Sequence, residues 1–295
     1  MLLLALACPD ELDVLGITTV AGNVPLKLTE RNARLMCELA GRTDIPVFAG
    51  SSKPMVRELV TAENVHGRTG IDGVEIHQPN IPLQAQHAVD FIIESLLAAE
   101  DNSITLVPTG PLTNVALAIE NQPEILPKIR EIVLMGGASR EGGNTTPSAE
   151  FNIYVDPHAA DIVLHCGRPL LIAGLDVSHQ VPVKKDCLDR LRAMNTKVAI
   201  ATLGMLEFFN RHDSEKYHIE GAPLHDPCTI AYLLKPELFR GKRCNIEVET
   251  ESSLTMGHTA VDFWGVSGRP ENATWLYRVN SEGFFELLLD RLARY

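Results

Sequence analysis

The chain has 295 residues, which is long enough for one large α/β domain with a substantial buried core. Hydrophobic residues make up 45% of it, and this excludes an intrinsically disordered protein, because such chains are poor in apolar residues. The formal net charge of −12 argues against a nucleic-acid partner, since phosphate binding requires a basic surface.

The chain opens with a short apolar segment, residues 1–8. No Lys or Arg precedes this segment, and it is shorter than the roughly 18 to 20 apolar residues of a transmembrane helix, as is every other apolar run. We interpret it as the second half of a buried helix, closed by Pro9 and Asp10. A helix that begins at Met1 has no N-cap, which indicates an N-terminus shorter than the fold requires.

The six cysteines are scattered along the chain without a C-x-x-C pair. This usage is typical of a reduced cytoplasmic protein with buried thiols, and not of a disulfide scaffold or a zinc site. Together with the absence of a transmembrane segment, it predicts a cytoplasmic protein that does not bind membranes.

Apolar, β-branched runs alternate with helical periodicity along the whole chain. The predicted strands cover residues 12–20, 46–49, 104–107, 132–135, 170–175, 245–250, 259–264 and 273–279. The predicted helices cover residues 28–40, 87–99, 114–121, 158–166, 184–194, 196–211, 228–234 and 282–293. This alternation predicts an α/β fold with a mostly parallel central sheet flanked by helices. No linker is evident, so we expect a single domain over residues 1–295.

Polar segments follow several of the predicted strands, at the edge of a parallel sheet where ligands bind. They cover residues 21–23, 108–114, 143–152 and 176–179. Amides and hydroxyls dominate these segments, which suits a neutral polyol such as a sugar better than a phosphate. Residues 63–82 lack clear periodicity, and we expect them to form a mobile loop that acts as a lid.

The tripeptide His225-Asp226-Pro227 allows two interpretations. Asp226 is suited to cap a helix whose first position is Pro227. Alternatively, its carboxylate is a hard oxygen ligand for a divalent cation, next to a histidine that can donate a proton. Asn23 and Asn114 likewise have ordinary structural readings as a turn former and a helix cap.

Five motifs occur in the order, and over nearly the whole length, of a known family. They are GITTVAGN at 16–23, TGPLTN at 109–114, VLMGG at 133–137, GNTTPSAEFNI at 143–153 and HDP at 225–227. In these motifs the chain resembles the inosine-uridine preferring nucleoside hydrolases. The resemblance implies hydrolysis of the N-glycosidic bond of ribonucleosides to ribose and free base, in nucleoside salvage. It also implies a homodimer or homotetramer.

The resemblance also assigns roles to individual residues. The Thr109 carbonyl and the Asp226 carboxylate resemble ligands of a Ca²⁺ ion deep in the pocket. Residues that hold the ribose hydroxyls in the family correspond to Asn23, Asn144, Glu150 and Asn152, and the catalytic residues to His225 and Asn152. His66 and Tyr217 lie where related enzymes surround the nucleobase. In this scheme the amides and Glu150 favour an oxocarbenium-like ribose, the metal activates water, and His225 donates to the departing base.

The chain departs from the family at its N-terminus. The family opens with a strand that ends in an aspartate cluster, D-x-D-x-x-x-D-D, and no copy of it is present here. Asp10 and Asp13 follow the first helix and do not replace it. We therefore expect the first strand of the fold to be missing, and Ca²⁺ affinity and turnover of this chain to be impaired.

Two explanations of this departure remain. In the favoured one the start was assigned at an internal Met, and in the other the chain is a non-catalytic nucleoside- or ribose-binding remnant without the metal site. The histidine beside Asp226 predicts an enzyme that accepts inosine and uridine or prefers pyrimidines.

Overall fold

The structure is a computed structural model that describes the backbone of residues 1–217 and 221–295 and the side chains of residues 1–211 and 221–295. The strands are β1 (Ile17–Thr19), β2 (Val47–Ala49), β3 (Leu83–Gln84), β4 (Ile104–Leu106), β5 (Ile129–Met135), β6 (Leu170–Ala173), β7 (Phe239–Val248), β8 (Thr259–Asp262) and β9 (Ala273–Val279). The helices are α1 (Leu2–Leu6), α2 (Leu26–Leu39), α3 (Glu63–His66), α4 (Ala88–Ala98), α5 (Thr113–Asn121), α6 (Phe151–Val155), α7 (Pro157–Leu164), α8 (Leu175–Ser178), α9 (Lys185–Met194), α10 (Lys197–Tyr217), α11 (Pro227–Leu234) and α12 (Ser281–Leu292). Two 3-10 helices, η1 (Pro123–Lys128) and η2 (Pro236–Leu238), connect some of these elements.

The strands form two sheets. The larger one has six strands in the order β4-β5-β6-β9-β7-β8, and the smaller one has three in the order β1-β2-β3. β4, β5, β6 and β9 run parallel, as do all three strands of the smaller sheet, whereas β7 is antiparallel to both β9 and β8. The predicted α/β fold with a mostly parallel central sheet flanked by helices is thereby confirmed. Its division into two sheets was not predicted.

The Asn114 side chain joins the two sheets near their carboxyl ends. Its Nδ2 donates to the carbonyl of Thr19 at the end of β1, at 2.9 Å, and its Oδ1 accepts from the amide of Ser51, beyond β2, at 2.9 Å. Asn114 itself lies in the first turn of α5, which follows β4. The buried Asn114 amide therefore connects the ends of β1, β2 and β4. This role is structural.

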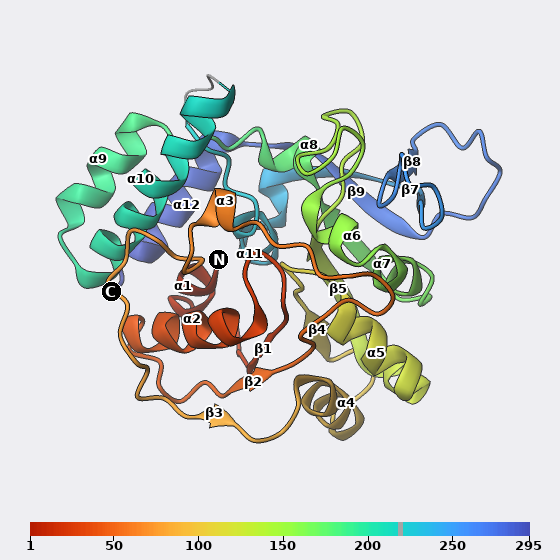
Figure 1. Ribbon diagram of the computed structural model, residues 1–295, viewed down its shortest axis with the longest axis horizontal. Helices are drawn as coiled ribbons and strands as arrows, with labels where there is room; N and C mark the ends of the chain where they lie inside the picture. The colour runs from red at the N-terminus through yellow and green to blue at the C-terminus, as the bar shows by residue number, and fades with distance from the viewer. Residues whose placement is uncertain (218–220) are drawn as a thin grey trace.

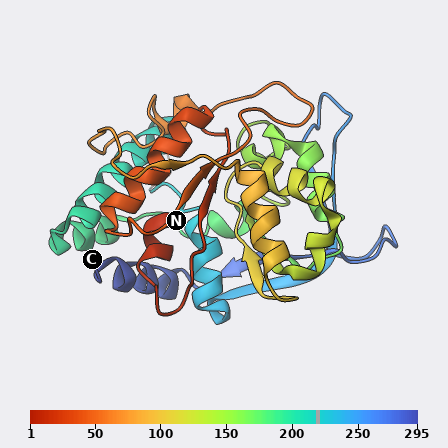
Figure 2. The same cartoon turned by 90° about the horizontal axis from the view of Figure 1, so that it is seen from below.

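Helices cover both faces of the larger sheet (Figure 1). Val133 and Leu171 face a cluster built with α1, α9, α11 and α12, whereas Ile132 and Leu134 face a second cluster built with α4, α5 and α7. Neighbouring residues of one strand thus point into opposite clusters, because side chains alternate across a strand. Burial on both faces explains the continuous apolar runs from which these strands were predicted. Figure 2 shows the same arrangement from below, with α4 and α5 stacked beside the strands.

Several predicted boundaries were wrong. Leu175 begins α8 instead of ending a strand, because β6 stops at Ala173. The next residue, Gly174, packs closely against Trp275: a Cβ added at Gly174 would lie 2.8 Å from the Trp275 ring. The first predicted strand, 12–20, is ordered as a strand only at Ile17–Thr19. β7 begins at Phe239, before the predicted residue 245, and residues 263 and 264 lie beyond the end of β8. The first part of β7 contains exposed basic residues, so its sequence lacks the apolar run that predicted the other strands.

Other features of the chain agree with the sequence interpretation or extend it. The first helix, α1, has Leu3, Leu4, Ala5 and Leu6 buried, as expected for the apolar opening segment. The predicted lid segment, 63–82, contains the short helix α3, and its mobility stays a prediction. Among the residues that the structure describes, no helix is both long and apolar enough to cross a bilayer.

Candidate active site

The polar segments that follow β4, β5 and β6 are joined by backbone hydrogen bonds. The amide of Met135 donates to the carbonyl of Pro108, at 3.0 Å, and the amide of Leu175 donates to the carbonyl of Gly137, at 2.9 Å. Met135 ends β5, and Leu175 begins α8 directly after β6. The carboxyl ends of three parallel strands therefore support one continuous polar surface, as predicted for this fold.

Glu150 is the buried acidic group of this surface, with 2% of the residue exposed. Its carboxylate caps α6, accepting from the amides of Asn152 and Ile153 at 2.9 and 3.2 Å, and it also accepts from the amide of Gly137 at 2.9 Å. Burial raises the pKa of Glu150 to about 7, against the three hydrogen bonds, and the Asp226 carboxylate adds to the rise. This carboxyl therefore changes its charge near neutral pH and connects the loop after β5 to α6.

Asn152 lies beside the Thr109 carbonyl, so a predicted ribose ligand and a predicted metal ligand are neighbours. Its Nδ2 donates to the carbonyl of Met135 at 3.1 Å and, more weakly, to that of Thr109 at 3.4 Å. These donations fix the orientation of the amide. No described residue donates a hydrogen bond to the Asn152 Oδ1, which leaves this oxygen for a ligand hydroxyl.

Asn144 closes the loop that leads to α6. Its Oδ1 accepts from the amide of Phe151, at 2.9 Å, while the residue itself is exposed. The loop 143–150 is therefore folded back on the helix that it precedes. Asn144 holds this loop in place and presents its Nδ2 to solvent or a ligand.

Asp226 precedes Pro227 at the start of α11, but its side chain makes no capping hydrogen bond. The capping interpretation therefore does not describe the structure, and the carboxylate is left for another partner. Burial raises the pKa of Asp226 above its ordinary value, and the nearby Met1 amino group opposes this rise. A partly buried carboxylate without a capping bond is a group that a cation would stabilise.

His225 is held on one side by Ser178. Its Nδ1 lies 2.8 Å from the Ser178 Oγ, and its ring lies 5.8 Å from the His179 ring. Burial, together with the charges of His179 and His66, lowers the pKa of His225 to about 3. At this pKa the imidazole of the free protein is neutral near pH 7.

The three remaining predicted residues differ in how the structure places them. Asn23 is exposed after β1, and its carbonyl accepts from the amide of Ala62, at 2.9 Å, so it supports the segment that leads to α3. His66 ends α3 with its ring stacked on Phe209 of α10, at 5.6 Å, and it acts electrostatically on His225. Tyr217 ends α10, and its side chain lies outside the described residues.

The structure also brings in residues to which the sequence assigned no role. Asp176 of α8 accepts from the amides of Ser139 and Arg140, at 2.8 and 2.7 Å, and thereby holds the loop after β5. His179 pairs with Glu141 of the same loop, at 3.0 Å. The polar run 176–179 directly after a strand was the available signal, but only contacts across the fold reveal what each residue does.

The oxygen donors among the described residues are of the type that a divalent cation prefers, but they are fewer than its coordination shell requires. The Asp226 carboxylate and the Thr109 carbonyl are hard oxygens of the kind that Ca²⁺ prefers, and Glu150 lies within electrostatic reach of Asp226. Ca²⁺ takes about 6 to 8 oxygens, however. Among the described residues, the two predicted ligands supply only a small part of that shell.

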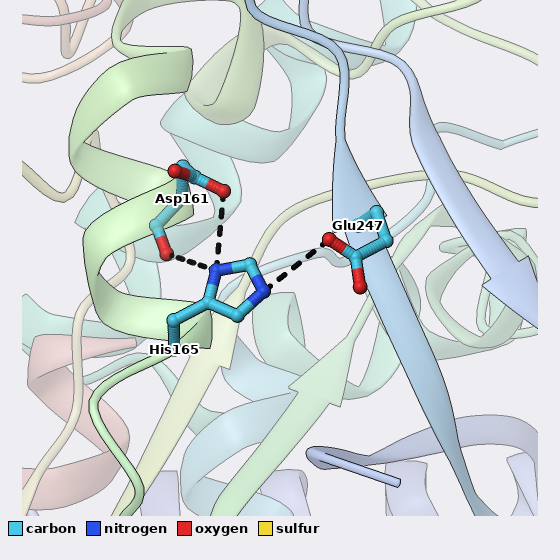
Figure 3. A group of neighbouring side chains, drawn as sticks. All are labelled: Asp161, His165 and Glu247. Carbon is cyan, nitrogen blue, oxygen red and sulfur yellow. Dashed lines mark hydrogen bonds and ion pairs between the residues drawn. The ribbon is translucent and has the colours of Figure 1, made fainter. Parts of the chain in front are cut away.

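A second group with metal-ligand side chains lies elsewhere, on α7 and β7 (Figure 3). The Nδ1 of His165 is 3.1 Å from Asp161 and its Nε2 is 3.3 Å from Glu247. Each of the three side chains offers one ligand atom, and these atoms all lie within 4.8 Å of one another, which is a spacing that a metal ion can bridge. Arg269 also lies 3.6 Å from Glu247. This group includes none of the predicted metal ligands and suits a surface ion-pair network.

Comparison with known proteins bears on the site as a whole. The model of the family described as inosine-uridine preferring nucleoside hydrolase matches residues 1–286. A pyrimidine-specific ribonucleoside hydrolase, RihA, of Photobacterium profundum is 48% identical over 295 residues, which cover 100% of this chain and 94% of that protein. An uncharacterized protein of Schizosaccharomyces pombe is 46% identical over 292 residues, covering 99% of this chain and 94% of that protein.

A solved structure extends the likeness to three dimensions. The purine-preferring ribonucleoside hydrolase of Gardnerella vaginalis superposes with a TM-score of 0.91 at 32% sequence identity. The superposition covers 98% of this chain and 94% of that one. The similarity therefore extends over nearly the whole chain, in three dimensions as well as in sequence.

Proposed function

The chain belongs to the inosine-uridine preferring nucleoside hydrolase family, whose members hydrolyse N-glycosidic bonds of ribonucleosides, and on this premise we propose that it acts on pyrimidine ribonucleosides. The observation that carries the proposal is the meeting of Glu150, Asn152 and the Thr109 carbonyl at one edge of the sheet. The pyrimidine preference is supported by 48% identity to a pyrimidine-specific relative, against 32% to a purine-preferring one.

The ribose is held by amides and a carboxylate. The free Asn152 Oδ1 accepts from a ribose hydroxyl, and the Asn144 Nδ2 donates to another. As the glycosidic bond breaks, positive charge develops on the ribose ring. The buried Glu150 carboxylate, when ionised, stabilises that charge in surroundings of low dielectric constant.

The base leaves toward His225. A neutral imidazole still donates a hydrogen bond through one nitrogen, and such a bond stabilises the charge that builds up on the departing base. His66 and Tyr217 belong to the same side of the pocket in this proposal. The stacking of His66 on Phe209, which connects α3 to α10, supports this assignment for His66.

A divalent cation, Ca²⁺, binds at Asp226 and the Thr109 carbonyl in this proposal. When bound, such a cation lowers the pKa of a bound water and thereby makes it a better nucleophile. The shortage of oxygen donors implies weak binding by the chain of 295 residues. The same shortage favours the second candidate function, a protein that binds nucleosides or ribose without cleaving them.

The protein acts in the cytoplasm as a homodimer or homotetramer in this proposal. An exposed apolar surface supports self-association: Trp264 and Val266, in the loop after β8, are 82% and 86% exposed. This loop projects from the body of the molecule in both ribbon views (Figures 1 and 2). Large exposed side chains of this kind are commonly covered by a partner.

Release of ribose from uridine, cytidine, inosine and adenosine, measured with and without added Ca²⁺, tests the proposal. We expect uridine and cytidine to be cleaved fastest, and Ca²⁺ to raise the rate. Faster release from inosine or adenosine would contradict the pyrimidine preference. Saturable nucleoside binding in a calorimeter without ribose release from any substrate would instead support the binding protein.

A further inference from the structure

We propose that Ser178 is a positioning residue for the base-leaving step, because it orients the His225 ring so that Nε2 is the nitrogen presented to the base. The inference rests on the proposed function, in which His225 faces the departing base. It concerns a residue of α8, 47 positions away from His225 in the chain, to which the family motifs in the sequence gave no role.

The contact is well placed for this role. Ser178 has no exposed surface, and its Oγ lies 2.8 Å from the His225 Nδ1 and 3.1 Å from the carbonyl oxygen of Gly174. No described residue forms a hydrogen bond with the His225 Nε2. Since the two ring nitrogens point away from each other, the bond at Nδ1 directs Nε2 away from α8.

A hydroxyl suits this position because it can accept and donate. When the Ser178 O–H donates to the Gly174 carbonyl, its oxygen accepts from an Nδ1–H of His225. When the hydroxyl turns to donate to an unprotonated Nδ1, Nε2 carries the proton. The Gly174 carbonyl then still accepts from the Ser178 amide, at 3.1 Å, so neither arrangement leaves it without a partner. The ring therefore keeps one orientation in both neutral tautomers.

The surroundings of Ser178 keep α8 in place. Asp176, two residues earlier, holds the loop after β5 through two backbone amides, and Gly174 packs against Trp275. Ser178 therefore lies on a short helix, α8, that is held in place by the loop after β5 and by Trp275. A hydrogen-bond partner on a rigid element holds a catalytic ring more accurately than one on a free loop.

In the reaction, the C1′–N bond breaks and its electron pair moves to the base. The His225 Nε2–H donates a hydrogen bond to the base as that negative charge develops. The oxygen of a water molecule bonds to C1′ and keeps one proton as the new ribose hydroxyl, and its other proton is balanced by the proton that the base takes up, so the products are ribose and the neutral base. Ser178 makes no contact with the base. It acts only by holding the donor in line, and a displacement of about 1 Å in such a group costs roughly 100-fold in rate.

The test compares two substrates that differ in leaving group. Uridine needs help to release its base, whereas 4-nitrophenyl β-D-ribofuranoside releases a stable phenolate that does not. We expect Ser178→Ala to lower kcat for uridine by about 10- to 100-fold, with a small change in KM, and to leave kcat for the nitrophenyl riboside within about threefold. In a His225→Ala background, adding Ser178→Ala should cause no further loss on uridine.

Two controls separate positioning from folding. Ser103→Ala removes another serine hydroxyl that donates to a backbone carbonyl, that of Glu100 at 2.6 Å, far from the site, and should change neither substrate. Ser178→Thr keeps the hydroxyl and should restore most of the uridine rate. In ¹⁵N-histidine NMR spectra, the His225 ring signals should move in Ser178→Ala and stay unchanged in Ser103→Ala.

Other results overturn the inference in distinguishable ways. Equal losses on both substrates in Ser178→Ala, or a further loss in the double variant, would mean that the serine only supports the fold. If the His225 ring signals did not move in Ser178→Ala, Ser178 would not determine the orientation of the His225 ring. A wild-type chain that cleaves neither substrate would overturn the proposed function, and the inference with it.

Discussion

Two histidines in this molecule have opposite surroundings. His225, which follows the carboxyl ends of the strands, is partly buried and is partnered by the neutral hydroxyl of Ser178. His165, the residue directly after α7, lies between the carboxylates of Asp161 and Glu247, with 47% of its side chain exposed. The arrangement at His165 looks more like a metal or catalytic site, because it combines a histidine with two acids.

The difference teaches that burial and the kind of partner decide what a histidine can do. Exposed ion pairs contribute little to stability because water and salt screen them. A buried imidazole with a neutral partner stays uncharged, and its second nitrogen remains available to a ligand. The less conspicuous histidine is therefore the better candidate for chemistry, and each prediction below tests that contrast.

The largest effect is expected from removing the buried histidine. His225→Ala should lower kcat for uridine by about 100- to 10,000-fold, the range that general acid–base groups contribute. His165→Ala is the matched control and should leave the rate unchanged. Steady-state kinetics on both variants checks this. A loss in His165→Ala as large as that in His225→Ala would remove the distinction between the two sites.

A smaller but still large effect is expected at the uncapped carboxylate. Asp226→Asn keeps the size of the side chain and removes its charge, so Ca²⁺ binding should become undetectable by calorimetry and kcat/KM for uridine should fall by about 100-fold. The control is Asp161→Asn in the surface cluster, which should bind Ca²⁺ as the wild type does. Loss of Ca²⁺ binding in Asp161→Asn would mean that Ca²⁺ binds at the surface cluster of Asp161, His165 and Glu247 and not at Asp226.

The fold was largely predictable because its strands are buried on both faces. β6 and residues 132–135 of β5 are continuous apolar runs, and the helices between the strands keep their periodicity. The start of β7 escaped prediction because Arg240, Lys242 and Arg243 are exposed on an antiparallel segment. α6 escaped because it has five residues and depends on the cap that Glu150 provides.

The site was predictable only where its chemistry lies in contiguous motifs. Glu150 and Asn152 are two residues apart, and the contact of Asn152 with the loop after β4 follows from the order of the strands. By contrast, the bond between Ser178 and His225 joins distant parts of the chain. The two interpretations of Asp226 could not be separated by sequence, since both place an acid before Pro227. Only the observed lack of a capping bond distinguishes them.

The buried acid of the site should make stability depend on pH. Folding raises the pKa of Glu150 from its ordinary 4.5 to about 7, so the folded chain binds this proton more tightly than the unfolded one. The group therefore stabilises the fold fully below pH 4.5, and this contribution is lost as the pH rises to about 7. The maximal slope is about 1.4 kcal/mol per pH unit.

Glu150→Gln isolates this contribution because glutamine does not titrate in this range. In urea unfolding with a chelator present, the free energy of unfolding of the wild type should fall relative to the variant as the pH rises from 4.5 to 7. Glu247→Gln, in the exposed cluster, should show no such difference. Parallel curves for the wild type and Glu150→Gln would mean that the carboxyl keeps its ordinary pKa.

The smallest effect is expected at the exposed histidine. His165→Ala removes the contacts of the ring with Asp161 and Glu247, but both carboxylates remain accessible to water, and Glu247 keeps Arg269 as a neighbour. The free energy of unfolding should therefore drop by no more than about 1 kcal/mol at low salt and by less at high salt. Urea unfolding at both salt concentrations measures this. A drop of several kcal/mol that salt does not reduce would mean that this network stabilises the packing of α7 on β7, and that exposure is a poor guide to what a histidine contributes here.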